Sequence, residues 1–142
     1  MPQYAHFGDS GADLFATESA ELAPMERKAI STGLAAETPV GFELQVRPKS
    51  GLALKSGLTV LNTPGTIDHG YRGEIKVILI NLSQEKYIVE KGQKVAQLVA
   101  APVARAEFEK VNELSDSSRG AGGFGSTGVK RISGMIKTTL FL

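Results

Sequence analysis

The sequence contains no cysteine, no tryptophan and only two histidines among its 142 residues. The absence of cysteine excludes disulfides, cysteine-ligated zinc, iron–sulfur clusters and thiol nucleophiles, and it fits a reducing compartment such as the cytoplasm. His6 and His69 lie far apart in the chain. A histidine-rich metal site is therefore excluded, and a serine–histidine–acid triad would have to use one of these two residues.

The chain also has no large net charge and no long apolar run. Sixteen Lys and Arg nearly balance 15 Asp and Glu, for a net charge of +1, which lacks the positive excess of a general nucleic-acid-binding protein. No apolar stretch approaches the ~20 residues that cross a bilayer, and no secretory signal is recognised at the start. We therefore expect a cytoplasmic protein of one main domain, with no nucleic-acid or membrane partner.

Short strands separated by turn signals dominate the pattern. Residues 41–47 alternate apolar and polar side chains, as a half-buried strand does, and residues 75–82 are apolar on both faces. Further expected elements are strands at 28–32, 58–61, 87–89, 95–103 and 106–111, a helical turn at 52–56 and a type II turn at 63–66. The pattern predicts an all-β fold, a jelly-roll-like β-sandwich or barrel.

The composition changes after Leu114. Five glycines fall within the nine residues 120–128, and such a segment cannot form a core. We therefore divide the chain into a jelly-roll β domain at 1–114 and a flexible glycine-rich arm with an extension at 115–142. Two interpretations of the arm stay open: a disordered tail, or a phosphate-binding flap whose backbone N–H groups surround an anion.

Three segments before the arm carry groups that suit a nucleotide. Residues 47–52 bring a cation, a hydroxyl and a free backbone N–H to one turn, which fits a phosphate clamp. On the hairpin that follows, Asn62 can read a pyrimidine edge, Asp68 can activate water, and Tyr71 offers a ring to a sugar. Asp13 lies among small and apolar residues. Taken singly, these segments also fit an exposed turn, a polar hairpin and a capping residue.

In this order, the segments resemble the five motifs of the trimeric deoxyuridine triphosphate nucleotidohydrolases, the dUTPases. The similar stretches are residues 12–14, 48–53, 65–75, 92–98 and 119–128. The resemblance implies a jelly-roll subunit of a homotrimer whose active sites are shared between subunits. It also implies hydrolysis of dUTP to dUMP and pyrophosphate, with Mg²⁺ held mainly by the substrate triphosphate.

The resemblance further implies a role for each matching residue. Asp68 would activate the water that attacks the α-phosphorus, and Arg119 would clamp the β- and γ-phosphates. Tyr71 would exclude a ribose 2′-hydroxyl, and Asp13 would reach the metal through water. The other substrate-binding residues would be Lys49, Ser50, Gly51 and Gln97 at the phosphates, Asn62, Thr66 and Ile67 at uracil, Lys76 at the nucleotide, Phe124 stacked on uracil, and Gly125, Ser126 and Thr127 at the outer phosphates.

Two features depart from the family pattern. Lys49 stands where the second motif usually carries arginine, so the charge is kept but the bidentate fork is lost, and residues 129–142 extend beyond the fifth motif. Two rival functions fit parts of the sequence. A dCTP deaminase, similar in fold, needs a glutamate where Ile78 stands, and a regulatory nucleotide-binding module without turnover is disfavoured by intact Asp68 and Arg119.

Overall fold

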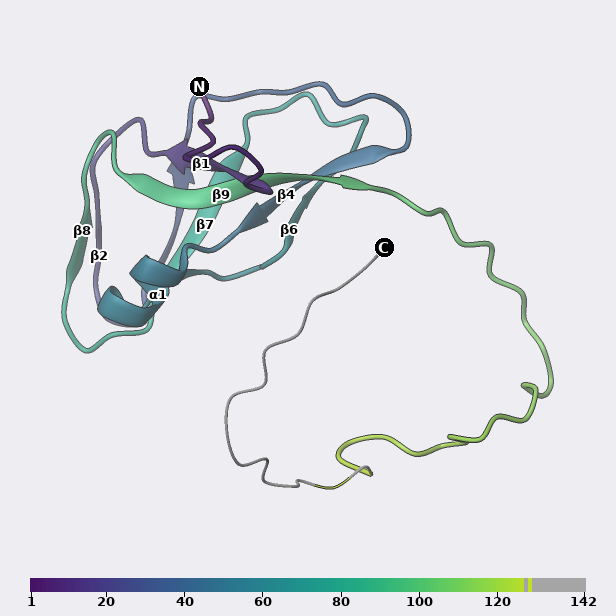
Figure 1. The fold of residues 1–142 in the computed structure, drawn as a ribbon. Coiled ribbons are helices and arrows are strands. Elements are labelled where there is room, and N and C mark those ends of the chain that lie inside the picture. The colour runs from purple at the N-terminus through teal and green to yellow at the C-terminus, as the bar shows by residue number, and fades with distance from the viewer. Residues whose placement is uncertain (127, 129–142) are drawn as a thin grey trace. The chain divides into compact units, whose positions relative to one another are not determined.

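The computed structural model describes residues 1–126 and residue 128 of the chain. Internal contacts divide the chain into two units, Met1–Ala106 and Glu107–Leu142. The first unit contains the regular secondary structure of the described residues (Figure 1). Its elements are β1 (Gly11–Phe15), β2 (Ala20–Leu22), β3 (Arg27–Ser31), β4 (Phe42–Arg47), α1 (Ser50–Ser56), β5 (Leu58–Val60), β6 (Gly65–Ile67), β7 (Lys76–Asn81), β8 (Tyr87–Val89) and β9 (Lys94–Pro102).

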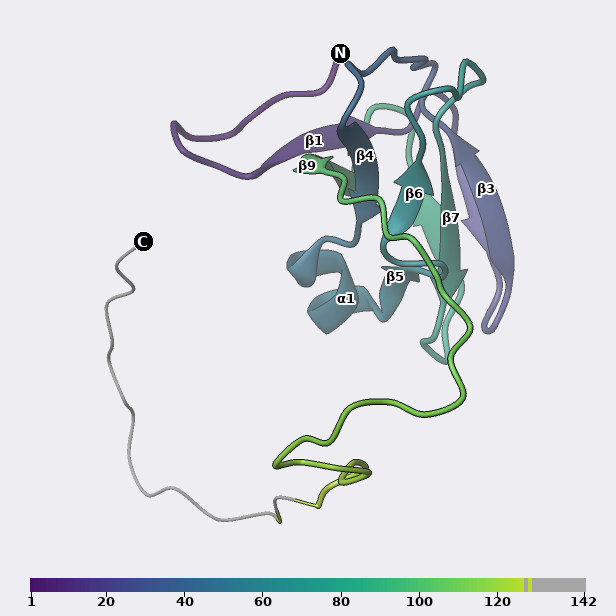
Figure 2. The ribbon, with the colours of Figure 1, turned by 90° about the vertical axis from the view of Figure 1, so that its right-hand side faces the viewer.

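The strands pair antiparallel in three small sheets. The largest has the order β1-β9-β4-β6, the second has the order β3-β7-β5, and β2 pairs with β8. Figure 2 shows β1, β9 and β4 on one side of the unit and β3 and β7 on the other, with β6 between them. This arrangement is a jelly-roll-like β-sandwich, as the alternating patterns predict.

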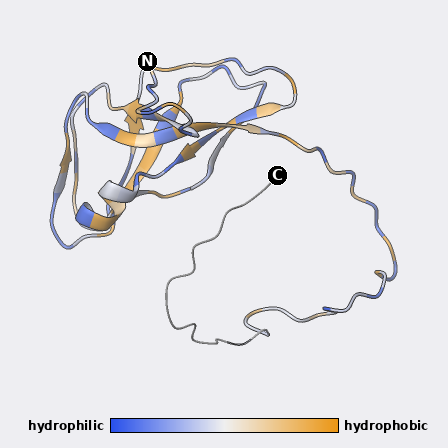
Figure 3. Cartoon of the chain, viewed as in Figure 1, coloured by the Kyte–Doolittle hydropathy of each residue, from blue (hydrophilic) through white to orange (hydrophobic). Residues whose placement is uncertain are grey.

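Apolar side chains from all three sheets meet in one core. The largest fully buried side chains are Leu14, Leu22, Ile30, Leu58, Val60, Ile75, Val77, Leu79, Val89 and Val95. Strand β7, at the centre of its sheet, is strongly hydrophobic along its length (Figure 3). Its sequence does not alternate because Val77, Leu79, Ile80 and Asn81 are all buried, and Ile78 is partly buried beside the pocket.

A buried amide ends β7. Asn81 is fully buried, and its Nδ2 donates to the backbone oxygens of Leu22 at 3.0 Å and Glu85 at 2.8 Å. Its Oδ1 accepts from the backbone N–H of Ser83 at 2.9 Å. Because each polar atom is satisfied, the amide stabilises the turn from β7 into β8 instead of destabilising the core.

The structure corrects four expectations. Residues 106–111 form no strand, although Ala106 and Phe108 alternate with Glu107 and Glu109. The helical turn is longer, from Ser50 to Ser56, and ends at Gly57, which has a φ of 63°. The type II turn at 63–66 is wrong, since the Thr63–Pro64 peptide is cis and Gly65 already belongs to β6. Strands β1, β2 and β6 were not predicted.

Within the described part of the chain, no helix has the length and apolar character needed to span a bilayer.

Candidate active site

A pocket of about 460 Å³ opens beside β6 and β7 in the first unit. Its apolar lining comes from Ala29, Val46, Ile75 and Ile78, and its polar lining includes Thr66, Glu74 and Lys76. Six residues expected to bind substrate line it together: Asn62, Thr66, Ile67, Asp68, Tyr71 and Lys76. An apolar surface with a few polar groups is the usual composition of a small-molecule site.

Gly65 brings Asn62 close to the sheet. A Cβ on Gly65 would lie 3.3 Å from Asn62 Nδ2 and 3.4 Å from Val46 Cβ. The missing side chain therefore lets the Asn62 amide lie against β6, where it lines the pocket. Strand β6 is itself held by pairing with β4, through Leu44 opposite Ile67.

Asp68 directly follows β6 in the chain and is exposed. Its backbone oxygen accepts from the Tyr71 N–H at 3.0 Å, which closes the turn between the two residues. Asp68 lines the pocket, so water and substrate can reach its carboxylate. Free access is what a group that takes a proton from water requires.

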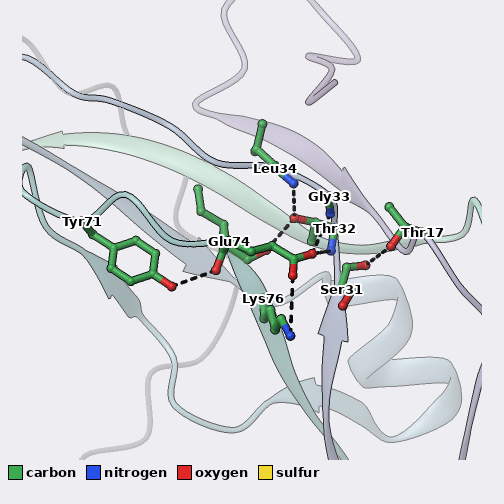
Figure 4. A network of polar contacts seen from close by, with 9 residues as sticks. Thr17, Ser31, Thr32, Gly33, Leu34, Tyr71, Glu74 and Lys76 are labelled. Atoms are coloured by element: carbon green, nitrogen blue, oxygen red, sulfur yellow. Dashed lines mark hydrogen bonds and ion pairs between the residues drawn. The ribbon is translucent and has the colours of Figure 1, made fainter.

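The Tyr71 ring is held against its own turn. Its hydroxyl donates to the backbone oxygen of Glu74 at 2.9 Å (Figure 4). A Cβ at Gly73 would lie 2.4 Å from this hydroxyl oxygen, so only glycine at position 73 permits the arrangement. The ring is 45% exposed and forms one wall of the pocket.

The Glu74 carboxylate joins the ends of β3 and β7. Its Oε1 accepts from the backbone N–H groups of Thr32 at 3.1 Å and Gly33 at 2.9 Å, and its Oε2 lies 3.5 Å from Lys76 Nζ (Figure 4). The Gly33 N–H bond, with the nearby Lys76 charge, holds the pKa of Glu74 below its usual range. Glu74 is therefore a fixed anion at the edge of the pocket.

A second polar cluster surrounds Asp13 on β1. Asp13 is only 4% exposed, and its carboxylate pairs with Lys49 through Oδ1 and with Lys94 Nζ at 2.8 Å through Oδ2. Burial raises the pKa of Asp13, but the hydrogen bonds and charges of the two lysines outweigh this effect and hold the pKa below its usual value. Asp13 is thus a buried, fully paired carboxylate.

Gln97 lies between the strands that carry these charges. It is directly opposite Asp13 on β1 and opposite Arg47 on β4. A Cβ at Gly11 would lie 3.1 Å from Gln97 Cβ, so the Gln97 side chain passes over this glycine. Lys49 immediately precedes α1, whose first two residues, Ser50 and Gly51, are exposed. None of these five residues, Asp13, Lys49, Ser50, Gly51 and Gln97, lines the pocket.

The arm residues belong to the second unit. Arg119 Nε donates to the backbone oxygen of Gly122 at 2.8 Å, and Ser126 donates its N–H to Gly123 at 3.0 Å. Phe124 is fully exposed, with a φ of 46°, and Gly125 has a φ of 93°. Thr127 lies outside the described residues, as does the extension at 129–142.

Three residues with a part in this geometry were missed. Gly73 and Glu74 lie in the third similar stretch, but only the folded turn brings them against Tyr71 and Thr32. Lys94 should point away from Gln97 by simple alternation. The β1–β9 register shifts between Leu14 and Phe15, and this irregularity turns Lys94 toward Asp13.

The carboxylate oxygens of Asp13 suit a Mg²⁺ ion whose main ligands belong to a bound substrate. Among the described residues, no group of three or more His, Asp or Glu side chains could hold a metal ion. Asp13 is ionised and already paired with two lysines. Because Mg²⁺ keeps several waters and often binds through substrate phosphates, a water-mediated contact to Asp13 fits this chemistry.

Comparison with known proteins gives a consistent result. The family model for dUTPase matches residues 1–128. The deoxyuridine 5′-triphosphate nucleotidohydrolase of Clostridium kluyveri is 56% identical over 128 residues, covering 90% of each chain, and that of a Hydrogenobaculum species is 57% identical over 131 residues, covering 92% of this chain and 91% of the relative.

Solved structures agree with the sequence comparison. A variant dUTPase of Staphylococcus bacteriophage 80alpha, with dUpNHpp, superposes with a TM-score of 0.84 at 30% identity and covers 91% of this chain and 92% of its own. A phage phi11 dUTPase variant, described with a structural Mg(II) ion, superposes with a TM-score of 0.75 at 27% identity, covering 82% of this chain and 92% of its own. From its fold, its pocket and these relatives, the chain belongs to the dUTPase family.

Proposed function

We propose a role for each site residue of this chain in the hydrolysis of dUTP to dUMP and pyrophosphate, which is the reaction of its family. The observation that carries the proposal is the pocket, which gathers Asn62, Asp68 and Tyr71 on one surface. An apolar lining with polar groups at its edge suits a pyrimidine nucleoside, whose ring faces are apolar and whose edges form hydrogen bonds.

The nucleoside is proposed to bind between β6 and the Tyr71 turn. The Asn62 amide offers one acceptor and two donors, which match the edge of uracil, and the backbone of Thr66 and Ile67 lies beside it. The Tyr71 ring forms a wall against the deoxyribose. A fixed wall excludes a 2′-hydroxyl by volume, since packed rings adjust little.

Asp68 is proposed as the general base. Its carboxylate accepts a proton from water as the water oxygen bonds to the α-phosphorus. The bond from that phosphorus to the bridging oxygen then breaks, and pyrophosphate leaves with the bridging oxygen. No covalent enzyme intermediate is required, because positioning and charge stabilisation provide most of the catalysis in phosphoryl transfer.

The phosphates are proposed to meet the cluster around Asp13. Lys49 and Ser50 donate to phosphate oxygens, with the N–H of Gly51 and the Gln97 amide beside them. Asp13 would hold Mg²⁺, the family's cofactor, through water, and the ion would supply positive charge to the substrate phosphates.

The glycine-rich arm, with its proposed boundary after Leu114, is assigned to the outer phosphates and the base. Arg119 supplies the charge for the β- and γ-phosphates, and Gly125, Ser126 and Thr127 supply N–H and hydroxyl donors. Phe124, which is fully exposed in the described chain, is assigned to stacking on uracil.

A homotrimer is proposed as the working assembly. The pocket residues and the Asp13 cluster are separate in one chain, since none of the phosphate-side residues lines the pocket. Residues 106–111 were expected to form a strand but pair with no strand in the described part of the chain, and Phe108 and Val111 are 96% and 50% exposed. Both features fit a site completed by neighbouring subunits. Light scattering should give three times the 15.1 kDa of one chain.

One assay tests the function as a whole. Pyrophosphate release should be fast with dUTP and Mg²⁺, and slow with dCTP, UTP or dTTP. A protein that binds dUTP without releasing pyrophosphate would be a binding module. We further propose the cytoplasm as its location, which the absence of cysteine supports.

A further inference from the structure

Glu74 and Lys76 are charged residues at the edge of the pocket, and they differ in the contacts that fix their charged groups. Glu74 is anchored by the N–H groups of Thr32 and Gly33, at 3.1 and 2.9 Å. Among residues 1–126 and 128, the Lys76 ammonium has one ionic neighbour, Glu74 Oε2 at 3.5 Å, and its side chain is 49% exposed. The Glu74 carboxylate therefore determines the direction in which the Lys76 ammonium points.

The anchor of Glu74 is rigid. Gly33 has a φ of 65°, and with Thr32 it presents two consecutive N–H groups to one carboxylate oxygen, which is the geometry of a backbone anion nest. The Thr32 hydroxyl donates to the backbone oxygen of Ile75, and the Ile75 N–H donates to the backbone oxygen of Leu34 at 2.7 Å. These bonds fix the end of β3 to the start of β7 around the carboxylate.

Residue 74 also supports the part of the pocket wall that Tyr71 forms. Its backbone oxygen accepts the Tyr71 hydroxyl at 2.9 Å, while its side chain faces Lys76 (Figure 4). Tyr71, Glu74 and Lys76 all line the pocket. One residue thus connects the two side chains that border the nucleoside.

We propose that Glu74 is a positioning residue for substrate binding: its anchored carboxylate holds the Lys76 ammonium at the pocket, where the ammonium donates to an acceptor oxygen of the bound nucleoside. An ammonium is a donor only, so it suits the carbonyl or ring oxygens of deoxyuridine. The inference rests on the proposed binding of the nucleoside in this pocket. Glu74 takes no part in the chemical step.

The test is a double-mutant cycle on the full chain with dUMP as the probe, measured by titration calorimetry. Glu74→Gln keeps an amide oxygen for the N–H groups of Thr32 and Gly33 but turns a donor toward Lys76. Lys76→Met removes the ammonium. Each change should raise the dUMP Kd about tenfold, the loss expected when one charge-assisted hydrogen bond is weakened. The double variant should bind no more weakly than Lys76→Met alone.

A matched pair elsewhere in the chain provides the control. Glu26 accepts the Ala23 N–H at 2.8 Å and pairs with Lys28 Nζ at 3.1 Å, also two residues along the chain. Neither residue lines the pocket. Glu26→Gln should therefore leave the dUMP Kd and dUTP turnover unchanged. In Glu74→Gln the effect should fall on the KM for dUTP and not on kcat.

The outcomes separate the possibilities. A Glu74→Gln protein with a lower melting temperature but an unchanged dUMP Kd would overturn the proposal, because the carboxylate would then be structural only. Additive effects of the two changes would overturn it as well. An unchanged Kd in Lys76→Met would reject the contact from Lys76 itself, whereas loss of the proposed function would appear as wild-type protein that fails to hydrolyse dUTP.

A second variant keeps the test decisive if Glu74→Gln fails to fold. Glu74→Asp retains the charge but withdraws it by one methylene from Lys76. It should raise the dUMP Kd by about threefold, between wild type and Lys76→Met. A wild-type Kd in Glu74→Asp, with a similar melting temperature, would contradict the positioning role.

Discussion

The hydroxyl of Tyr71 lies directly over the α-carbon of Gly73. A Cβ at position 73 would come 2.4 Å from the Tyr71 hydroxyl oxygen and 2.6 Å from Cζ. Contacts this short do not occur between real side chains, so a residue larger than glycine would push the ring away. The Tyr71 hydroxyl would then lose its 2.9 Å bond to the Glu74 oxygen.

Gly73→Ala should therefore weaken the discrimination between dUTP and UTP, although the Tyr71 side chain itself is unchanged. We expect the ratio of kcat/KM for dUTP over UTP to fall about tenfold, a change typical of a misplaced steric wall. Gly70→Ala is the matched control, because a Cβ at Gly70 meets nothing within 4 Å. An unchanged ratio in Gly73→Ala would show that the Tyr71 ring does not select the sugar.

Tyr71→Ala and Tyr71→Phe separate the ring from its hydroxyl. Removal of the ring should narrow the preference for dUTP over UTP by at least as much as Gly73→Ala, since the wall is gone. Tyr71→Phe keeps the ring and loses only the bond to Glu74, so its preference should change less than about threefold. Steady-state kinetics with both nucleotides measure the two ratios, and equal losses in both variants would contradict the steric explanation.

Asp68→Asn keeps the shape of the side chain and removes its basicity. We expect kcat to fall roughly 10²–10⁴-fold, the range for losing general-base catalysis. The affinity for dUpNHpp should change little, because the carboxylate acts on water more than on substrate. Asp9→Asn, in the exposed turn after β-bridge residue Gln3, serves as the control. Normal turnover by Asp68→Asn would remove Asp68 from the mechanism.

The contribution of Glu74 to the free energy of unfolding should decrease as the pH falls. Its folded pKa is lowered, first by the Gly33 N–H bond, so the fold favours the ionised form. The contribution is therefore present above the unfolded pKa, about 4.3, and is lost as the pH falls through the folded value. Calorimetric melting of wild type and Glu74→Gln should differ at pH 7 and converge toward pH 3. A difference that grows on acidification would contradict this sign.

Truncation after Ser118 tests the arm. This change removes Arg119, Phe124 and the glycine-rich segment, which contribute no buried apolar residue among those described. The trimer mass and dUMP binding should persist, since the pocket lies in the first unit. We expect kcat to fall by about 10³-fold, because the charge-assisted contacts to the outer phosphates are lost. Wild-type kcat in a truncated trimer would mean that the arm is only a tail.

The sequence by itself determined the composition-based exclusions, the strand-rich class and six of the residues that line the pocket. The alternation at 41–47 and the apolar run at 75–82 became β4 and β7, since burial of one or both faces leaves a direct trace in the order of residues. Asn62, Asp68 and Tyr71 were identified because they lie close together in the sequence, and Asp68 and Tyr71 also belong to one similar stretch. Local pattern was sufficient there.

Only the tertiary structure decided the contacts between distant segments. The pairing of Asp13 with Lys49 and Lys94 joins residues from three separate parts of the chain, and the β1–β9 irregularity that turns Lys94 has no signature in alternation. Residues 106–111 were expected to form a strand but form none among the described residues, because a strand needs a paired neighbour and local sequence does not determine whether one is present. The role of Glu74 depends likewise on the N–H groups of Thr32 and Gly33, more than forty positions away, which only the pairing of β3 with β7 brings to its carboxylate.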